Sequence, residues 1–383
     1  MINLEEAHLN IAAASHPGMT GKKNEDRYGV SAFLTGPIGD TPAVLGVLCD
    51  GIGGHRAGEV AAQMGVSIIT ETVAASDGSQ PLNILEDAVK RANHAIYEAS
   101  LSNQGRKGMG ATCACAWVID DRLYTANLGD SRIYLLREGH ILQLSTDHTW
   151  LQEAFDAGVI DENQGEAHPN AHVIRRYLGS GKPPIADFRL WFFEGESDAE
   201  ALDNQGLHLA PDDIVLICSD GLTDLVSDEE IQALIKTYPI KEATQALIKL
   251  ANARGGHDNS TVVLMEVPEK RNLLRERIVK KRTGRQRMRT LLGCLAALII
   301  AALLAVGVFI GMRWWEGRSG LLTITATPTQ STLQVFPQPF PTQTAAEEQF
   351  TITPTATFTT TPVEGLTTPR PTITPWPTHT AAP

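Results

Sequence analysis

The chain has 383 residues, of which 43% are hydrophobic, and its formal net charge is −12 at pH 7. This length is enough for one large globular domain with additional segments. Residues 1–268 carry 19 Lys and Arg against 38 Asp and Glu, and a domain this acidic argues against nucleic-acid binding as the main function.

The first predicted elements are apolar strands that begin or end at an acidic residue. In "NEDRYGV" the residues Glu25 and Asp26 precede an apolar run, and the run "VLGVLCD" ends at Asp50. Residues 48–59 around Asp50 contain four glycines, and Asp-Gly is a common turn dipeptide. Taken alone, this stretch predicts either an ordinary turn or a carboxylate and bare backbone that hold a charged ligand.

The same pattern returns farther along the chain, between segments of helical periodicity. Asp130 lies between two strand-like runs in residues 123–136, Asp220 ends an apolar run that begins at residue 212, and Asp258 precedes a last strand. Apolar residues recur at helical spacing over 83–100, and a glycine pair follows the helix predicted over 242–254. Ser227 and Glu230 form a capping box before another helix. This irregular alternation predicts an α+β fold with antiparallel sheets.

Aspartates at strand ends, spread over more than 200 residues, predict one shared site at an edge of the sheets. Each of them could cap or turn the chain by itself, but that explanation is weak for all of them together. The set offers oxygen donors and no cysteine, which favours the hard cations Mg²⁺ or Mn²⁺. Such cations would also neutralise the repulsion among neighbouring carboxylates. The residues are Asp26, Asp50, Asp130, Asp220 and Asp258.

The C-terminal part predicts a single-pass anchor in the cell membrane. Residues 269–289 carry ten Lys and Arg against two acidic residues, and residues 290–312 contain no charge. A helix of that length crosses the hydrocarbon core, and the basic flank places residues 1–268 in the cytoplasm and residues 313–383 outside the cell. Residues 321–383 contain 20 Thr and 11 Pro, which predicts a disordered tail. The basic segment either only fixes this topology or also binds anionic lipid.

Eight motifs, taken in order, resemble those of the PPM-type (type 2C) metal-dependent serine/threonine protein phosphatases, especially the bacterial branch. They fall within residues 8–268 and are "NED" at 24–26, "DGIGGHRAGE" at 50–59, "MGAT" at 109–112, "NLGDSRIY" at 127–134, "DHTW" at 147–150, "IRRYLG" at 174–179, "CSDGLTD" at 218–224 and "GGHDNSTVV" at 255–263. The resemblance implies a four-layer sandwich of two antiparallel β-sheets flanked by helices. It also implies hydrolysis of phosphoserine and phosphothreonine on proteins, opposed to a cognate Ser/Thr kinase.

The resemblance further implies the metal ligands. Asp50 matches the carboxylate that bridges two Mn²⁺ or Mg²⁺ ions, and the carbonyl of Gly51 matches a further ligand. Asp220 and Asp258 match ligands of the first ion, and Asp130 with Asp220 matches a third-ion site of bacterial members. A water between two such cations loses a proton near neutral pH and attacks phosphorus in line.

Three other residues receive roles from the same resemblance. Glu25 and Asp26 match acidic residues that hold metal-bound waters or orient other ligands. His55 matches a general acid for the leaving alkoxide, although a solvated loop histidine is the alternative.

One departure from the family concerns the substrate phosphate. Many relatives carry an arginine five residues before the aspartate of the NED motif, where this chain has Gly21 followed by Lys22 and Lys23. A lysine cannot reproduce the bidentate fork of arginine, so either phosphate binding is weaker or one of the lysines takes over. Alternatively, both lysines are solvated surface charges.

The departure also keeps a second class of function open, a membrane-anchored pseudophosphatase or scaffold with weak or no activity. The complete set of metal-binding residues argues against it. A receptor whose tail senses the outside is a third hypothesis, but the composition of the tail suits a spacer better.

Overall fold

The computed structural model describes residues 1–52, 57–160, 168–193 and 195–269, together with residues 306–308, 310 and 312. The described part of residues 1–269 contains two large antiparallel sheets, as the sequence predicts, and a two-stranded sheet formed by β5 (Gly51–Ile52) and β6 (Gly110–Ala111). The larger sheet has the order β1 (Ile2–Asn3), β3 (Arg27–Thr35), β4 (Thr41–Cys49), β7 (Cys113–Ile119), β8 (Arg122–Leu128) and β11 (Leu207–His208). The smaller sheet has the order β10 (His140–Gln143), β9 (Arg132–Arg137), β12 (Ile214–Cys218), β13 (Ser260–Glu266) and β2 (Asn10–His16).

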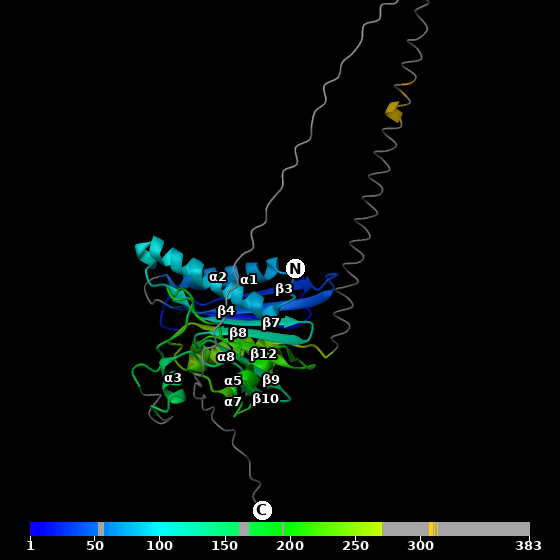
Figure 1. Cartoon of the computed structure of the whole chain (residues 1–383). Helices are drawn as coiled ribbons and strands as arrows, with labels where there is room; N and C mark the ends of the chain where they lie inside the picture. The colour runs from blue at the N-terminus through cyan, green and yellow to red at the C-terminus, as the bar shows by residue number, and fades with distance from the viewer. Residues whose placement is uncertain are drawn as a thin grey trace, which may run out of the picture. The chain divides into compact units, whose positions relative to one another are not determined.

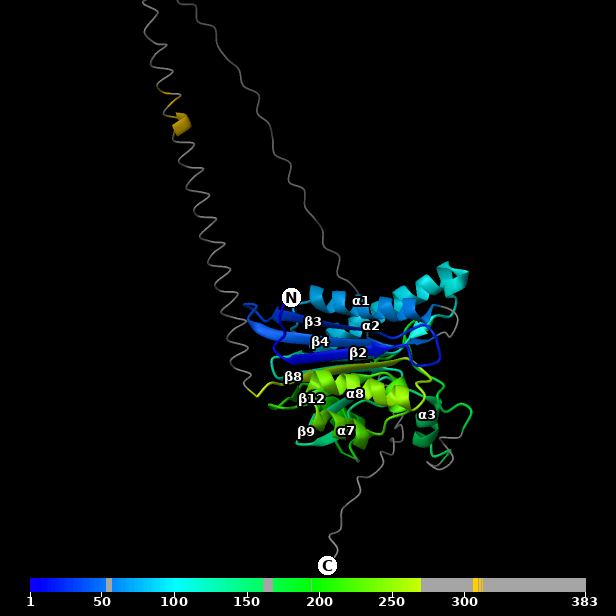
Figure 2. The same ribbon diagram turned by 180° about the vertical axis from the view of Figure 1, so that it is seen from behind.

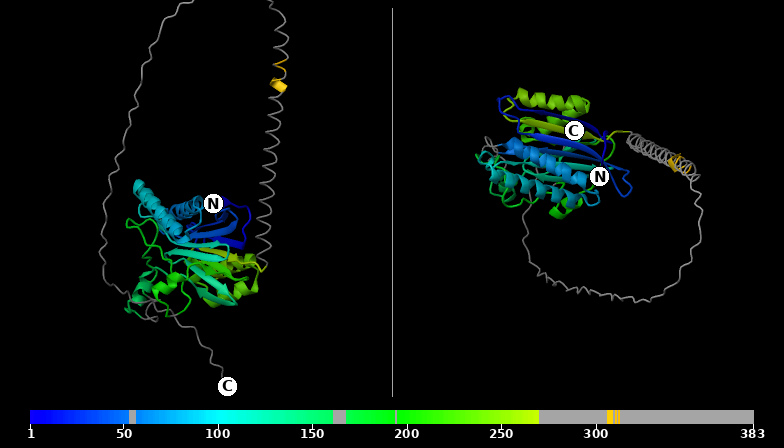
Figure 3. Two further views of the ribbon diagram at one scale, coloured as in Figure 1. Left: turned by 45° about the vertical axis from the view of Figure 1, so that its right-hand side comes forward. Right: turned by 90° about the horizontal axis from the view of Figure 1, so that it is seen from above.

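Helices cover the outer face of each sheet. The helices α1 (Gly58–Ala75) and α2 (Pro81–Ser102) share a core with the larger sheet, whereas α7 (Asp228–Thr237) and α8 (Ile240–Ala253) share one with the smaller sheet. Figures 1 and 2 show the resulting order of helices, sheet, sheet and helices, and Figure 3 shows these layers from two further directions. The remaining short elements are η1 (Gln104–Arg106), α3 (Trp150–Asp156), α5 (Asp198–Asp203) and α6 (Asp220–Thr223).

The central strand β4 is buried on both faces because its side chains alternate between two cores. Leu45 and Val47 pack with α1 and α2, and Val44 and Leu48 pack between the two sheets. Successive side chains of a strand point to opposite faces, so a strand covered on both sides needs apolar residues at every position. This explains why the run that leads to Asp50 is continuously apolar.

The predicted helix signals are confirmed. The helix predicted over 83–100 is α2, and its buried residues include Leu85 and Val89 at helical spacing. In α7 the side chain of Ser227 accepts from the backbone of Glu230, and the side chain of Glu230 accepts from the backbone N–H of Ser227, which completes the capping box. The helix α8 ends before Gly255 and Gly256, whose φ angles of +121° and +50° suit glycine.

The predicted C-terminal segments stay predictions. No helix among the described residues is long and apolar enough to cross a membrane. Of the predicted span 290–312, residues 306–308, 310 and 312 are described as helical, and the other positions lie outside the described residues. The basic segment after residue 269 and the tail 313–383 lie outside them as well.

Candidate metal centre

The strand register brings eight strand ends to one edge of the two sheets. In the larger sheet Arg27 pairs with Cys49 and Cys113 pairs with Leu128, so β3 and β7 begin where β4 and β8 end. In the smaller sheet β9 begins at Arg132, which pairs with Cys218 at the end of β12, and β13 begins at Ser260, which pairs with His16 at the end of β2. All five predicted aspartates therefore lie beside this edge, because each is within two residues of one of these strand ends: Asp26, Asp50, Asp130, Asp220 and Asp258.

Mutual repulsion shows that the carboxylates form one cluster. Burial raises the pKa of Asp50 well above its usual value, and the charges of Asp26, Asp220 and Asp130 raise it further. Burial likewise raises the pKa of Asp220, with contributions from Asp130, Asp26 and Asp258. For Asp130 burial and the nearby Asp147 raise the pKa to about 7. The structure thus brings together the aspartates that the sequence placed up to 232 positions apart.

The cluster has the donors that a hard cation needs. The atoms Oδ1 of Asp26, Asp130 and Asp220 are buried and have no hydrogen-bond partner within the described part of the chain. A buried carboxylate oxygen without a partner is costly, and a cation or an ordered water removes that cost. The available donors are oxygens, which suits Mg²⁺ or Mn²⁺.

The carboxylates alone do not complete a coordination shell. In the described ranges, no three Asp, Glu, His or Cys side chains are grouped closely enough to hold an ion by themselves. Mg²⁺ binds through one or two carboxylates and keeps several waters, so a shell shared with carbonyl oxygens and water fits this arrangement. The candidate carbonyl is that of Gly51.

Asp26 is fixed from the smaller sheet. Asp26 is 2% exposed, and its Oδ2 accepts hydrogen bonds from Ser219 Oγ at 2.8 Å and Thr261 Oγ1 at 2.7 Å. Burial raises the pKa of Asp26 despite these hydrogen bonds, which act in the opposite direction. One oxygen is therefore held by hydroxyls while Oδ1 stays available to a cation or water. The sequence analysis missed Ser219 and Thr261, although both lie inside the quoted motifs.

Asp50 is positioned through its backbone and through two glycines. Its N–H donates to Thr112 Oγ1 at 2.8 Å, and its carbonyl accepts from the N–H of Thr112 at 2.8 Å. A Cβ atom on Gly51 would lie 2.4 Å from the carbonyl carbon of Gly58, and one on Gly58 would lie 2.7 Å from the Gly51 oxygen. Only glycine permits this approach of β5 to the first turn of α1. In place of the turn predicted at Asp50-Gly51, the chain passes from β4 through Asp50 into the short strand β5, and residues 53–56 lie outside the described residues.

Glu25, Lys22 and Lys23 precede Asp26 in the chain, and each has its own partner. The N–H of Glu25 donates to Asn259 Oδ1 at 2.7 Å, and burial, Glu59 and Asp258 raise the pKa of Glu25. Lys22 Nζ lies 4.0 Å from Asp258 Oδ2, and Lys23 forms an ion pair with Glu59.

The two remaining predicted positions are Gly21 and His55. A Cβ atom on Gly21 would meet no heavy atom within 4 Å, but the φ angle of +74° favours glycine, so an arginine at this position has space and a strained backbone. His55 lies outside the described residues.

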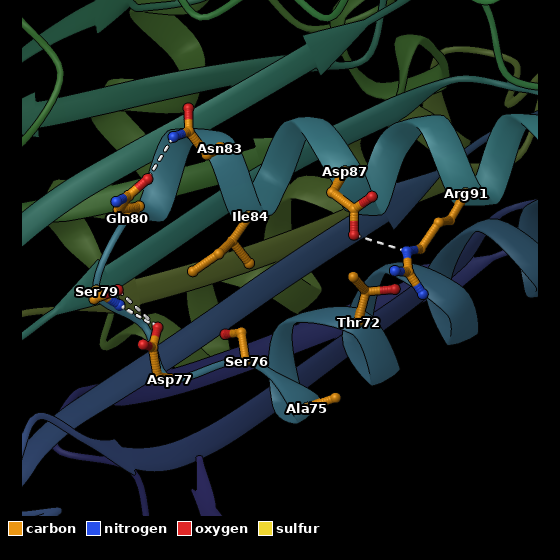
Figure 4. Close-up of a pocket in the computed structure, with 10 residues that line it drawn as sticks. All are labelled: Thr72, Ala75, Ser76, Asp77, Ser79, Gln80, Asn83, Ile84, Asp87 and Arg91. Atoms are coloured by element: carbon orange, nitrogen blue, oxygen red, sulfur yellow. Dashed lines mark hydrogen bonds and ion pairs between the residues drawn. The ribbon is translucent and has the colours of Figure 1, made fainter. Parts of the chain in front are cut away.

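A separate pocket lies at the other end of α1 and does not include the predicted site residues. Its volume is about 400 Å³, and Figure 4 shows it between the end of α1, the loop that follows and the start of α2. Its polar groups already pair with one another: Arg91 with Asp87 at 2.7 Å, and Asn83 with Gln80 at 2.6 Å. Nothing in it resembles the unpartnered oxygens of the carboxylate cluster.

Comparison with known proteins agrees with this geometry. The family model described as protein phosphatase 2C matches residues 22–154. The serine/threonine protein phosphatase PstP of Mycobacterium tuberculosis is 34% identical over 260 residues, which are 68% of this chain and 45% of PstP. The serine/threonine phosphatase stp of Listeria monocytogenes is 32% identical over 226 residues, covering 57% of this chain and 83% of that protein.

A solved structure extends the comparison to three dimensions. The catalytic domain of PstP, in complex with two manganese ions, is 32% identical to this chain and matches with a TM-score of 0.55. The match covers 68% of this chain and 99% of that domain. The similarity to full-length PstP spans less than half of that protein.

Proposed function

The chain belongs to the protein phosphatase 2C family, and we propose that it is a metal-dependent phosphatase acting on phosphoserine and phosphothreonine of proteins. The observation that carries the proposal is the cluster of mutually repelling carboxylates, three of which have buried oxygens that meet no hydrogen-bond partner among the described residues. The solved PstP domain with two manganese ions supports the choice of Mn²⁺ or Mg²⁺.

We propose the following assignment of ligands. Asp50 and the Gly51 carbonyl would hold two cations between them, and Asp220 and Asp258 would be further ligands of the first ion. Asp130 binds a third ion together with Asp220, which the charge interaction between these two residues supports. When bound, the cations supply Lewis-acid activation of water and neutralise phosphoryl oxygens.

Other residues around the cluster would orient these ligands and the substrate. Asp26, held by Ser219 and Thr261, keeps one oxygen pointing to the cluster, and Glu25 is held through its backbone by Asn259. Both would hold waters of the bound cations. His55 remains the proposed general acid for the leaving alkoxide.

Of the two lysines, Lys22 is the better candidate for the substrate phosphate. Its ammonium group lies 4.0 Å from Asp258 and is largely exposed, whereas Lys23 is engaged by Glu59 on the first turn of α1. A cation bound at Asp258 would weaken the attraction of Lys22 to that carboxylate. Lys22 would then be free to contact a phosphoryl oxygen beside the metal centre.

Turnover of p-nitrophenyl phosphate and of a phosphothreonine peptide, measured with Mn²⁺ and after EDTA treatment, tests the proposal. We expect Mn²⁺-dependent release of phosphate by the wild type and by Asp203→Asn, an exposed control, and loss of activity in Asp258→Asn. The glycine at position 21, where many relatives carry arginine, favours a second candidate, a membrane-anchored pseudophosphatase or scaffold with weak or no activity. Binding of the phosphopeptide without release of phosphate would support that alternative.

We also propose that the protein is anchored in the cell membrane with the phosphatase domain in the cytoplasm, where a Ser/Thr kinase and its substrates are the partners. The support is the uncharged run 290–312 behind the basic segment 269–289. Residues 306–308, 310 and 312 are helical, and the side chains of Val306, Val308, Ile310 and Met312 are exposed. Recovery of the full chain in detergent-solubilised membranes, rather than in the soluble fraction, tests the anchor.

A further inference from the structure

His148 holds the turn that carries Asp130. The histidine is 4% exposed, and two hydrogen bonds join it to Gly129, the residue before Asp130. Its backbone N–H donates to the Gly129 carbonyl at 2.9 Å, and the N–H of Gly129 donates to the ring nitrogen Nδ1 at 3.1 Å. The backbone N–H and carbonyl of Gly129 therefore both form hydrogen bonds with His148, and the carbonyl also accepts from Asn127 Nδ2 at 3.4 Å.

These contacts determine which of the two ring nitrogens of His148 carries the proton. Because Nδ1 accepts a hydrogen bond, the ring proton lies on Nε2. This nitrogen is 3.2 Å from Oδ2 of Asp187 and donates to it. The Asp187 carboxylate also accepts from Nε of Arg189 at 2.9 Å and 3.1 Å. Burial acts to raise the pKa of Asp187, but the hydrogen bonds from Arg189 and His148 outweigh it and hold this pKa well below its usual value. An ionised Asp187 thus orients the ring.

The turn needs such support because Gly129 contributes no side chain to fix it. Its φ angle is +98°, and a Cβ atom there would lie 2.6 Å from Cγ2 of Thr112, so the position is restricted to glycine. Glycine is the most flexible residue, and Asp130 directly follows it. Among the described residues the buried Oδ1 atom of Asp130 has no hydrogen-bond partner, so the position of this oxygen depends on the backbone that carries the side chain.

We propose that His148, oriented by Asp187 and Arg189, is a positioning residue that fixes the Asp130 carboxylate for the ion bound between Asp130 and Asp220. The inference rests on the proposed function in that it takes Asp130 to be a ligand. Partners that orient the groups around a metal site contribute strongly to affinity, and their loss weakens metal binding about 10-fold to 100-fold.

Two substitutions test the contacts of the two ring nitrogens separately. In His148→Asn the side-chain oxygen takes the place of Nδ1 and can still accept from Gly129, but the contact with Asp187 is lost. In His148→Gln the side-chain nitrogen takes the place of Nε2 and can still donate to Asp187, but the acceptor for Gly129 is lost. Asp187→Asn is a third variant, because an amide facing Nε2 can move the ring proton to Nδ1, against the N–H of Gly129.

The measurement is Mn²⁺ binding to the full chain, followed by the electron paramagnetic resonance signal of free Mn²⁺, with the melting temperature of the metal-free protein as a second readout. We expect His148→Gln to lower the affinity for the ions that Asp130→Asn also removes, by about 10-fold or more. The affinity for the other ions should stay unchanged. His148→Asn should retain most of this affinity. In the Asp130→Asn background, His148→Gln should change Mn²⁺ binding no further.

Equal weakening of all bound ions by His148→Gln, or wild-type binding in that variant, would overturn the proposal. The same holds if His148→Gln weakens binding further when Asp130 is already Asn. If His148→Gln does not fold, Asp187→Asn decides, since the proposal requires it to weaken the same ions selectively. Mn²⁺ binding does not require turnover, so a wild type that binds in this pattern without hydrolysing phosphate refutes the proposed function and leaves this inference standing.

Discussion

The raised pKa of Asp130 makes the stability of the metal-free protein depend on pH, and Asp130→Asn should remove this dependence. In the fold the pKa of Asp130 is about 7 against an ordinary value of 3.8. A carboxyl group whose pKa is raised by folding binds its proton more tightly in the folded state. Its contribution to stability is therefore fully present below pH 3.8 and is lost as the pH rises through about 7.

The magnitude follows from the two pKa values. The interval from 3.8 to about 7, at about 1.36 kcal/mol per pKa unit, corresponds to a loss of about 4 kcal/mol between pH 4 and pH 8. This is an upper bound, because the protein and water rearrange around a buried carboxylate as it ionises and so reduce the cost of its charge. An asparagine has no charge to lose, so the metal-free variant should be more stable than the wild type at pH 8 and about equal to it at pH 4.

Urea unfolding after EDTA treatment, at pH values from 4 to 8, measures the difference. The free energy of unfolding of Asp130→Asn minus that of the wild type should increase steadily with pH. The exposed control Asp203→Asn should follow the wild type in parallel. With saturating Mn²⁺ this difference in the free energy of unfolding should shrink or change sign. The reason is that an ion bound through Asp130 stabilises the folded wild type and not the variant. A difference that stays constant from pH 4 to pH 8 would refute the reasoning.

Other predictions concern activity and topology. Asp220→Asn should lower turnover of p-nitrophenyl phosphate by at least about 100-fold, equivalent to about 2.7 kcal/mol, while the protein remains folded by circular dichroism; near-wild-type rates would remove the ligand assignment. Gly21→Arg should lower KM for a phosphopeptide several-fold and change kcat less, since a new charge-assisted donor contributes about 1.5–3 kcal/mol of mostly uniform binding. The φ angle of +74° at Gly21 makes this a test in which the loop backbone must shift, so the melting temperature of the variant is measured beside KM. An unchanged KM for Gly21→Arg, with an increase for Lys22→Ala, would show that Lys22 already fills that role. Protease added to intact cells should remove the Thr/Pro tail and spare residues 1–268; the opposite pattern would overturn the orientation.

The sequence predicts the positions of the carboxylates well because each one ends or begins a strand. An apolar run cannot continue through a charged residue, so Asp50 and Asp220 mark strand ends in the sequence as clearly as in the structure. Helix boundaries are equally local, as the capping box of Ser227 and Glu230 shows. These signals depend on residues within four positions of one another, which is why they are readable without the fold.

The contacts that hold the site could not be predicted, because they join distant parts of the chain. The hydroxyls that fix Asp26 come from residues 193 and 235 positions away, and serine and threonine are too common to be noticed. His148 and Asp187 are 39 positions apart, and only the tertiary structure shows that the histidine faces Gly129. The family motifs contained several of these residues, but a motif does not state which atom a side chain contacts.

The distribution of arginines shows which buried carboxylates are structural and which need an external cation. Three partly or fully buried aspartates each accept two or more hydrogen bonds from an arginine, and these pairs are Asp147 with Arg132, Asp187 with Arg189 and Asp213 with Arg137. Within the described residues, Asp26, Asp50, Asp130 and Asp220 form no such ion pair. A buried charge persists only when it is paired, protonated or bound to a metal. The chain neutralises its other buried aspartates with its own guanidinium groups, so the unpaired set at the sheet edge is where a divalent cation supplies the missing positive charge.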